Sequence, residues 1–196
     1  MRFSPEQAIK VMENTGVVQV FRQADPTKGT ELLDLGYSAG IRLFEYSNRE
    51  ENALEVFRKL SAHARQYADL ILGVGSVFSD EDARQFLDAG ADFIVSPVFI
   101  PTLGVYCNAR QVMWVPGCGT LTEIHNAREM GAQVIKVCPG NVLGPAFVSA
   151  AKNTFPSLHF VPSGGFDSGA TGLEEWMAAG AACVEMDFDK ESTGDD

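Results

Sequence analysis

A lysine within an apolar run is the strongest sign of chemistry in this sequence. Lys136 interrupts the run 134–138, where a buried strand is expected and lysine is among the least expected residues. Burial disfavours the charged ammonium, so we expect the pKa of Lys136 to fall and a neutral amine to become available as a nucleophile. A lysine that snorkels from the strand end, or that pairs with a neighbour, is the alternative.

Glu45 and Glu185 stand at positions that match the position of Lys136. Each of the three follows a helix-ending glycine by five residues, in the pairs Gly40 and Glu45, Gly131 and Lys136, and Gly180 and Glu185. We therefore expect the three side chains at one height, at the C-terminal ends of three strands. An amine beside a carboxylate forms a couple that can transfer a proton. For Glu45 the alternative is a structural carboxylate that holds Arg42 or Arg49.

Arg49 and the segment 163–165 are candidates for binding an anion. A guanidinium in the loop after the second expected strand can hold a carboxylate through two hydrogen bonds. A solvated surface arginine is the alternative for this residue. The N–H groups of Ser163, Gly164 and Gly165, at the end of another strand, can cradle an anion.

Two further glycine-rich segments, 73–76 and 116–120, also end expected strands. In segment 73–76, we expect the backbone to come close to another group. This segment lacks the third glycine of the dinucleotide-binding fingerprint. In the second, Thr120 can cap the following helix, with Glu123 completing a capping box. The three histidines lack metal-ligand spacing, so no metal site is expected.

The elements that must position these residues alternate between short β-branched runs and amphipathic stretches. A first helix begins with Ser4 as its cap and Pro5 in its first turn, and Gln7 completes a capping box. The expected strands are 17–21, 41–45, 70–74, 92–95, 112–115, 134–137, 158–161 and 182–185. The expected helices between them lie near 27–38, 50–66, 79–89, 99–109, 120–130, 144–153 and 170–179.

Eight strands joined by crossover helices predict a parallel sheet, and eight is the number that closes into a barrel. An open doubly wound sheet is the competitor, but it usually has five or six strands. The sequence therefore predicts an α/β fold, a (β/α)8 TIM barrel with an extra N-terminal helix, as a single domain over residues 1–186. A polar tail over residues 187–196 then leaves the eighth barrel helix missing or shortened.

Composition narrows the choice of partners and compartment. With 15 basic and 26 acidic residues, the net charge of −11 disfavours nucleic acid and anionic membranes as partners. No apolar run approaches the roughly 18 residues of a membrane span, and the polar first residues do not open a signal peptide. The four cysteines lack CxxC spacing, so we expect reduced thiols in a cytoplasmic protein.

Ordered motifs on successive expected strands resemble those of the KDPG/KHG aldolases, the 2-keto-3-deoxy-6-phosphogluconate and 4-hydroxy-2-oxoglutarate aldolases. These motifs occupy residues 42–49, 73–76, 96–97, 116–120, 135–139 and 162–165. The resemblance runs from the N-terminal helix to about residue 183. It implies a class I aldolase that cleaves a 2-keto-4-hydroxy acid to pyruvate and an aldehyde, on a TIM barrel that forms a homotrimer and needs no metal.

The resemblance also implies roles for single residues. Lys136 would form a Schiff base with the keto carbon of pyruvate, without a cofactor, and Glu45 would shuttle protons. Arg49 would help to bind the pyruvate carboxylate. The other implied positions line the site (Ser76 and Pro97), lie near the substrate (Thr120), or hold a distal phosphate or carboxylate (Ser163, Gly164 and Gly165).

The end of the chain departs from the family's pattern. The family closes with a glycine-rich stretch after strand 8 and a final packed helix, whereas this chain has Glu185 and Asp187 in that stretch and stops soon after. Two carboxylates would repel a phosphate, which favours substrates of the hydroxy-oxoglutarate type. Two other functions stay open: another sugar-phosphate barrel enzyme, which would not explain Lys136, and an inactive or structural barrel oligomer.

Overall fold

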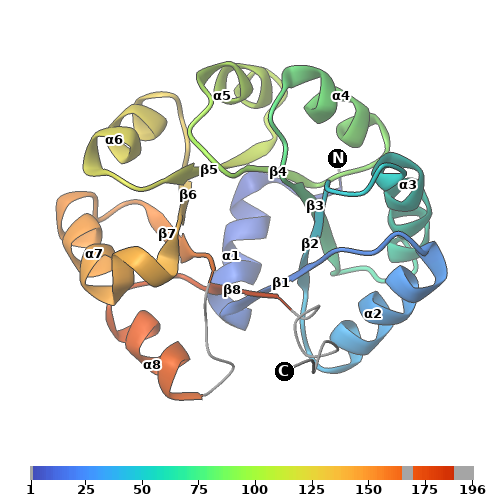
Figure 1. Ribbon diagram of the computed structural model, residues 1–196, viewed down its shortest axis with the longest axis horizontal. Helices are drawn as coiled ribbons and strands as arrows, with labels where there is room; N and C mark the ends of the chain where they lie inside the picture. The colour runs from blue at the N-terminus through green and yellow to red at the C-terminus, as the bar shows by residue number, and fades with distance from the viewer. Residues whose placement is uncertain (1, 165–169, 188–196) are drawn as a thin grey trace.

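The computed structural model describes residues 2–164 and 170–187, and these residues form a ring of parallel strands surrounded by helices (Figure 1). The helices are α1 (Pro5–Thr15), α2 (Pro26–Ser38), α3 (Ala53–Ala64), α4 (Asp80–Asp88), α5 (Pro101–Asn108), α6 (Leu121–Glu129), α7 (Gly140–Thr154) and α8 (Ala170–Ala178). The strands are β1 (Val17–Phe21), β2 (Leu43–Ser47), β3 (Ile71–Gly75), β4 (Phe93–Ser96), β5 (Met113–Cys118), β6 (Val134–Val137), β7 (His159–Pro162) and β8 (Val184–Asp187).

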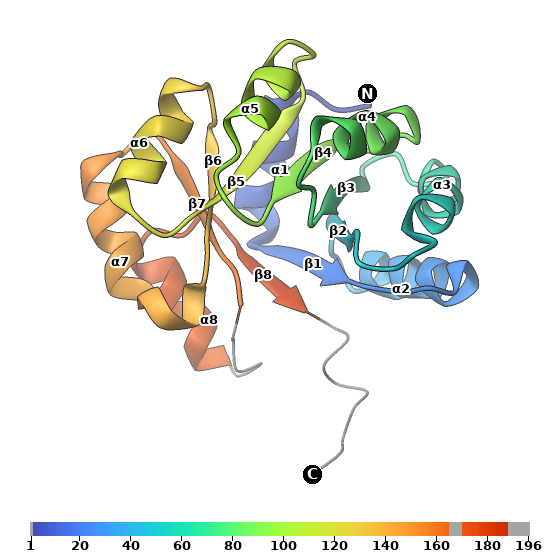
Figure 2. The same cartoon turned by 45° about the horizontal axis from the view of Figure 1, so that its top comes forward.

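The eight strands are ordered β7-β6-β5-β4-β3-β2-β1-β8, and every pair is parallel. A parallel bridge between Phe160 and Ala181 joins β7 to the residues just before β8 and brings the two ends of the sheet together. Figure 2 shows helices α2 to α8 on the outside of this ring, with α1 within it. The predicted TIM barrel with an extra N-terminal helix is therefore confirmed, and α2 to α8 each follow one of the strands β1 to β7.

Strands β2, β4 and β8 begin one or two residues later than the sequence predicts, because the residues after the helix-ending glycines still belong to the helix caps. The N–H of Ile41 donates to the carbonyl of Gly36, and the N–H of Ala91 donates to that of Phe86. Gly40, with a φ of 98°, supplies the left-handed residue that this cap requires. The sheet ladder can begin only after the cap has closed.

Apart from β1 and β6, the strands also extend further toward their C-terminal ends than predicted. β2 continues through Glu45 to Ser47, and Ser47 pairs with Gly75 of β3. β8 extends to Asp187, which pairs with Val20, so the strand reaches into the predicted tail. Residues 188–196, where the sequence predicts the rest of that tail and a missing eighth helix, lie outside the described residues.

Helix α1 fills one mouth of the barrel. Ser4 caps it with the predicted capping box, and Gly16, at a φ of 69°, ends it. Its buried side chains Ala8, Ile9 and Met12 pack with inward-facing strand residues in a core cluster inside the ring. A second, larger cluster fills the space between the strands and the outer helices. This apolar packing closes the mouth of the barrel in which Figure 1 shows α1.

Among the described residues, no helix is long and apolar enough to cross a membrane.

Candidate active site

Lys136, Glu45 and Glu185 meet inside the barrel. They lie on the inward faces of β6, β2 and β8, and their exposed fractions are 9%, 3% and 6%. The Nζ atom of Lys136 lies 2.6 Å from Oε2 of Glu185 and 3.6 Å from Oε1 of Glu45. The spacing of five residues after each helix-ending glycine therefore places the three side chains at one level, as the sequence predicts.

The carboxylates reverse the pKa shift that the sequence predicts for Lys136. Burial by itself lowers this pKa, but the negative charges of Glu185 and, next, Glu45 outweigh the burial, and the pKa is raised above its ordinary value. The predicted fall in the pKa is therefore wrong for the resting site. The burial of Lys136 agrees with the sequence, and the charge on β8 accounts for the opposite direction of the shift.

Glu45 carries its own proton at neutral pH. Burial raises the pKa of Glu45 to about 8, and repulsion by Glu185 adds to this effect while Lys136 opposes it. The Oε2 atom of Glu45 is buried and has no hydrogen-bond partner among the described residues. The resting site thus places the ammonium of Lys136 between Glu185 and the neutral carboxyl group of Glu45 in the buried interior of the barrel.

The room for Glu45 comes from a glycine on the next strand. A Cβ atom added to Gly75 of β3 would lie 1.8 Å from Oε1 of Glu45, so the carboxyl group lies directly against the bare backbone. The sequence marks segment 73–76 as a place of close approach without identifying the approaching group. In the structure that group is the carboxyl group of Glu45.

Arg49 and Ser76 lie together at the rim. Nε of Arg49 donates to Oγ of Ser76 over 3.1 Å, and the hydroxyl of Ser47 lies 3.2 Å from the same oxygen. Ser76 has a φ of 58°, a left-handed conformation that is uncommon for residues other than glycine. The alternative in which Glu45 holds Arg42 is wrong, because Arg42 binds Asp69 instead.

At the ends of β5 and β7, two of the predicted site residues already use hydrogen-bonding groups within the fold. Thr120 caps α6: its Oγ1 accepts from the N–H of Glu123 and donates to the carboxylate of the same residue. The N–H of Ser163 donates to the carbonyl of Val137 over 3.0 Å, so that this group of the predicted anion cradle is already bonded. Gly164 adopts a φ of 93°. Gly165 lies outside the described residues.

Pro97 lies next to the end of β5. A Cβ atom on Gly117 would lie 2.1 Å from the carbonyl oxygen of Pro97, so only a glycine lets the two backbones pass. Gly117 in turn pairs with Lys136 in the sheet. Gly117 thus lies between Pro97 and Lys136, and it contacts the backbone of one and pairs with the other.

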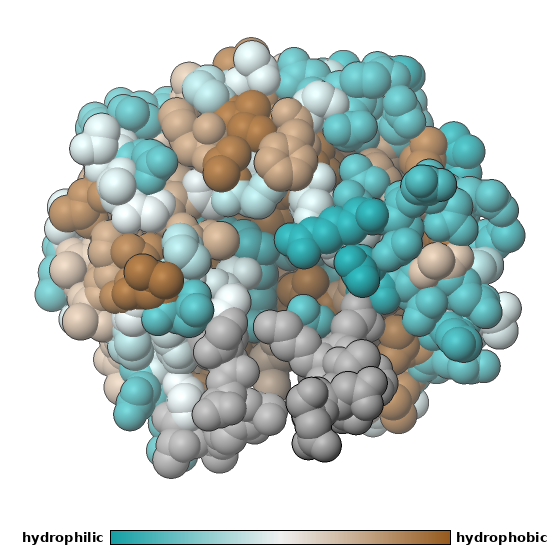
Figure 3. Space-filling view, viewed as in Figure 1, coloured by the Kyte–Doolittle hydropathy of each residue, from teal (hydrophilic) through white to brown (hydrophobic). Residues whose placement is uncertain are grey.

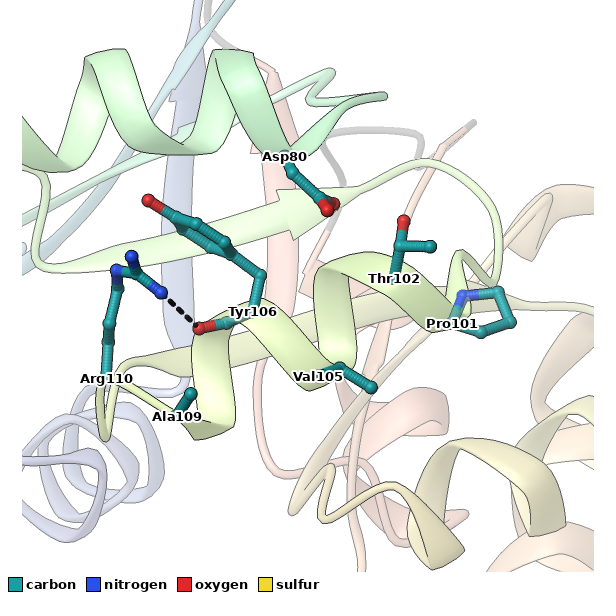
Figure 4. Close-up of a pocket in the computed structure, with 7 residues that line it drawn as sticks. All are labelled: Asp80, Pro101, Thr102, Val105, Tyr106, Ala109 and Arg110. Atoms are coloured by element: carbon teal, nitrogen blue, oxygen red, sulfur yellow. Dashed lines mark hydrogen bonds between the residues drawn. The ribbon is translucent and has the colours of Figure 1, made fainter.

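Within residues 2–164 and 170–187, no group of three histidine, cysteine or acidic side chains is arranged to hold a metal ion. The four cysteines are free. A pocket of about 430 Å³ lies outside the barrel, between the start of α4 and α5, and Figure 4 shows its lining. It shares no lining residue with the group around Lys136.

Glu185 belongs to the site in the structure but is not among the site residues predicted from the sequence. The five-residue spacing places it on the same rim, and that spacing is the signal that could identify it as a site residue. Its contact with Lys136 is shorter than that of Glu45.

Comparisons with known proteins agree with this geometry. Residues 8–187 match the family model described as KDPG and KHG aldolase. The chain is 38% identical over 142 residues to a 2-dehydro-3-deoxy-phosphogluconate aldolase of Treponema pallidum, which covers 72% of this chain and 65% of that protein. It is 25% identical over 179 residues to a protein of the same name from Haemophilus influenzae, covering 91% and 82%. The chain thus spans less than two thirds of the Treponema relative.

A solved structure shares the fold. It is the KDPG aldolase of Legionella pneumophila with pyruvate captured as a covalent carbinolamine intermediate, at a TM-score of 0.81 and 23% identity, covering 90% of this chain and 84% of that chain.

Proposed function

The chain belongs to the KDPG and KHG aldolase family, and from that premise we propose that it is a class I aldolase. In this proposal Lys136 forms a Schiff base with a 2-keto-4-hydroxy acid, and the reaction releases pyruvate and an aldehyde. The observation that carries the proposal is the buried amine of Lys136 beside the protonated carboxyl group of Glu45, 3.6 Å apart in the barrel. The carbinolamine named for the Legionella enzyme supports the same chemistry here.

The reaction needs an amine and one carboxyl group that gives and takes protons. Once the ammonium of Lys136 has given a proton to solvent, its neutral amine attacks the keto carbon. The resulting carbinolamine hydroxyl leaves as water after taking a proton from Glu45. The Glu45 carboxylate then removes the proton of the C4 hydroxyl. The C3–C4 bond breaks, its electrons pass into the iminium, and the aldehyde leaves.

The remaining steps return the site to its starting state. Glu45 gives its proton to C3 of the enamine, which forms the iminium of pyruvate. Water, activated by the same carboxylate, then adds to the iminium carbon and releases pyruvate. A carboxyl group whose pKa is raised to about 8 suits this work, because it exchanges a proton near neutral pH.

Substrate binding is assigned to the rim. We propose that Arg49, next to Ser76, holds the carboxylate of the keto acid through charge-assisted hydrogen bonds. Pro97 and Thr120 complete the wall of the site in this proposal. The distal group is assigned to Ser163 and Gly164, and to Gly165, which lies outside the described residues.

We also propose that the substrate lacks a distal phosphate. The carboxylates of Glu185 and Asp187 on β8 disfavour such a group, and the N–H of Ser163 is already bonded. A phosphorylated substrate is therefore expected to show little advantage in KM over its unphosphorylated analogue. A large advantage would contradict this assignment.

Trapping with borohydride tests the Schiff base. Reduction of the protein in the presence of pyruvate is expected to add the mass of one reduced pyruvate, and peptide mapping to place it on Lys136. Lys136→Ala should lose both the adduct and cleavage, while Lys59→Ala, which changes an exposed lysine paired with Glu55, should keep both. Absence of an adduct in folded protein would favour a barrel that has lost its chemistry.

A homotrimer in the cytoplasm completes the proposal. Exposed apolar residues at the rim and on α5, among them Phe78, Val98 and Val105, support self-association, and Figure 3 shows apolar surface over the α5 side. The free cysteines suit a reducing compartment. Sedimentation equilibrium should give three times the chain mass, and a monomer would contradict the trimer.

A further inference from the structure

We propose that Glu185 is a built-in counterion that holds Lys136 in its ammonium form and thereby restrains Schiff-base formation at neutral pH. This inference rests on the proposed function and adds a residue that sets the pH at which the reaction runs. In this inference, a residue of β8 controls what fraction of Lys136 is in the neutral, nucleophilic form. The carboxylate contacts the reacting nitrogen itself.

The geometry separates the two carboxyl groups around Lys136. Nζ lies 2.6 Å from Glu185, which is a short charge-assisted hydrogen bond, and 3.6 Å from Glu45, which is outside hydrogen-bond distance. All three residues are at least nine-tenths buried. Water and salt therefore screen the contact of Lys136 with Glu185 far less than they would at the surface.

The groups that face Lys136 come from three strands. Glu185 approaches from β8, Glu45 from β2, and Cys138 from just beyond the end of β6. Burial raises the pKa of the Cys138 thiol, which therefore stays neutral near pH 7. Glu45 is mostly protonated there as well, since its pKa is raised to about 8. Glu185 is therefore the acidic side chain in direct contact with Nζ, and it is the larger of the two acidic influences that favour the ammonium.

The pair has a direct cost for the chemistry. Only the neutral amine can attack a keto carbon, so each pH unit by which the ammonium form is favoured removes about nine-tenths of the remaining reactive amine. Glu185→Gln keeps the size of the side chain and removes its charge. With that charge gone, burial lowers the pKa of Lys136, and the amine should become reactive about one to three pH units lower.

Competitive labelling measures this shift without any substrate. The full chain, Glu185→Gln and Glu45→Gln would be treated with trace acetic anhydride, a neutral reagent, between pH 6 and pH 11. Peptide mapping would then give the acetylation rate of Lys136 at each pH. At pH 8 we expect Glu185→Gln to be at least about ten times as reactive as the wild type, and Glu45→Gln to shift less because of its longer contact. The surface variant Glu81→Gln, which also removes one charge, should match the wild type.

Coincident labelling curves for the wild type and Glu185→Gln would overturn the proposal. So would a larger shift in Glu45→Gln than in Glu185→Gln. If Glu185→Gln does not fold, as judged by circular dichroism, Glu185→Ala serves in its place and carries the same expectation.

Borohydride trapping with pyruvate, run on the same proteins at pH 7 and across the labelling range, separates this inference from the proposed function. Faster trapping in Glu185→Gln together with the labelling shift supports both. A labelling shift without an adduct in any variant at any pH supports the counterion and overturns the Schiff-base function. An adduct with coincident labelling curves does the reverse.

Discussion

Replacing Gly75 by alanine should displace the carboxyl group of Glu45 while leaving the barrel folded. The added Cβ would lie 1.8 Å from Oε1 and 2.6 Å from Cδ of Glu45, whereas real Cβ contacts essentially never fall below 3.0 Å. The carboxyl oxygen must therefore retreat by about 1.2 Å. The φ of Gly75 is not left-handed, so alanine fits the backbone itself. The strain falls on the end of a flexible side chain.

A displacement of about 1 Å at a catalytic group can cost about 100-fold in rate, equivalent to about 2.7 kcal/mol in transition-state free energy. We expect Gly75→Ala to lower kcat by about this factor, with overpacking costing about 1–3 kcal/mol of unfolding free energy. Pyruvate release, coupled to lactate dehydrogenase and followed by NADH absorbance, measures the rate. Urea unfolding measures the stability.

Gly29→Ala provides a matched control. Its Cβ would lie 2.9 Å from Cδ2 of Leu60, at the contact between α2 and α3 and away from the barrel interior. It should keep kcat near the wild-type value. The reasoning is refuted if Gly75→Ala retains wild-type kcat in folded protein, or if Gly29→Ala loses as much.

Three further outcomes follow from the contacts described. Glu45→Gln should lose about 10²- to 10⁴-fold in kcat. Because the pKa of Glu45 is raised to about 8, the stability of the wild type should fall as the pH rises from about 4.5 to 8. The unfolding free energy of Glu45→Gln relative to wild type should therefore increase with pH, by at most about 1.4 kcal/mol per pH unit, in urea titrations at pH 5 and pH 8. A difference independent of pH would contradict this. Arg49→Lys should raise KM for the keto acid with little change in kcat, because an ammonium cannot reproduce the planar fork beside Ser76; an unchanged KM would remove Arg49 from the site. Ser4→Ala should cost about 1 kcal/mol of stability through loss of the capping box with Gln7, measured by thermal unfolding, and should leave kcat unchanged; a stability equal to wild type would show that the cap contributes nothing.

The topology of the barrel and the level of its charged residues could be predicted from the sequence, because both depend on local rules. Glycines such as Gly40 and Gly131 end helices through a left-handed residue, and strand side chains then alternate with a period of two. Counting from these glycines was enough to place Glu45 and Lys136 on one rim. The exact strand ends could not be read in this way, because caps such as that of Ile41 use backbone groups before the ladder begins.

The charge state of the nucleophile was decided only by the tertiary structure. The apolar run around Lys136 predicts burial, and burial alone lowers the pKa of a lysine. Which charge reaches Nζ depends on the closure of the barrel, since β8 and β6 are not neighbours in the sheet and their side chains meet only across its interior. In the same way, the bond between the Ser163 N–H and Val137 exists only because β7 lies beside β6. Barrel closure decides which residues far apart in the sequence become electrostatic or hydrogen-bonding partners. The sequence pattern predicts only which buried polar groups need a partner.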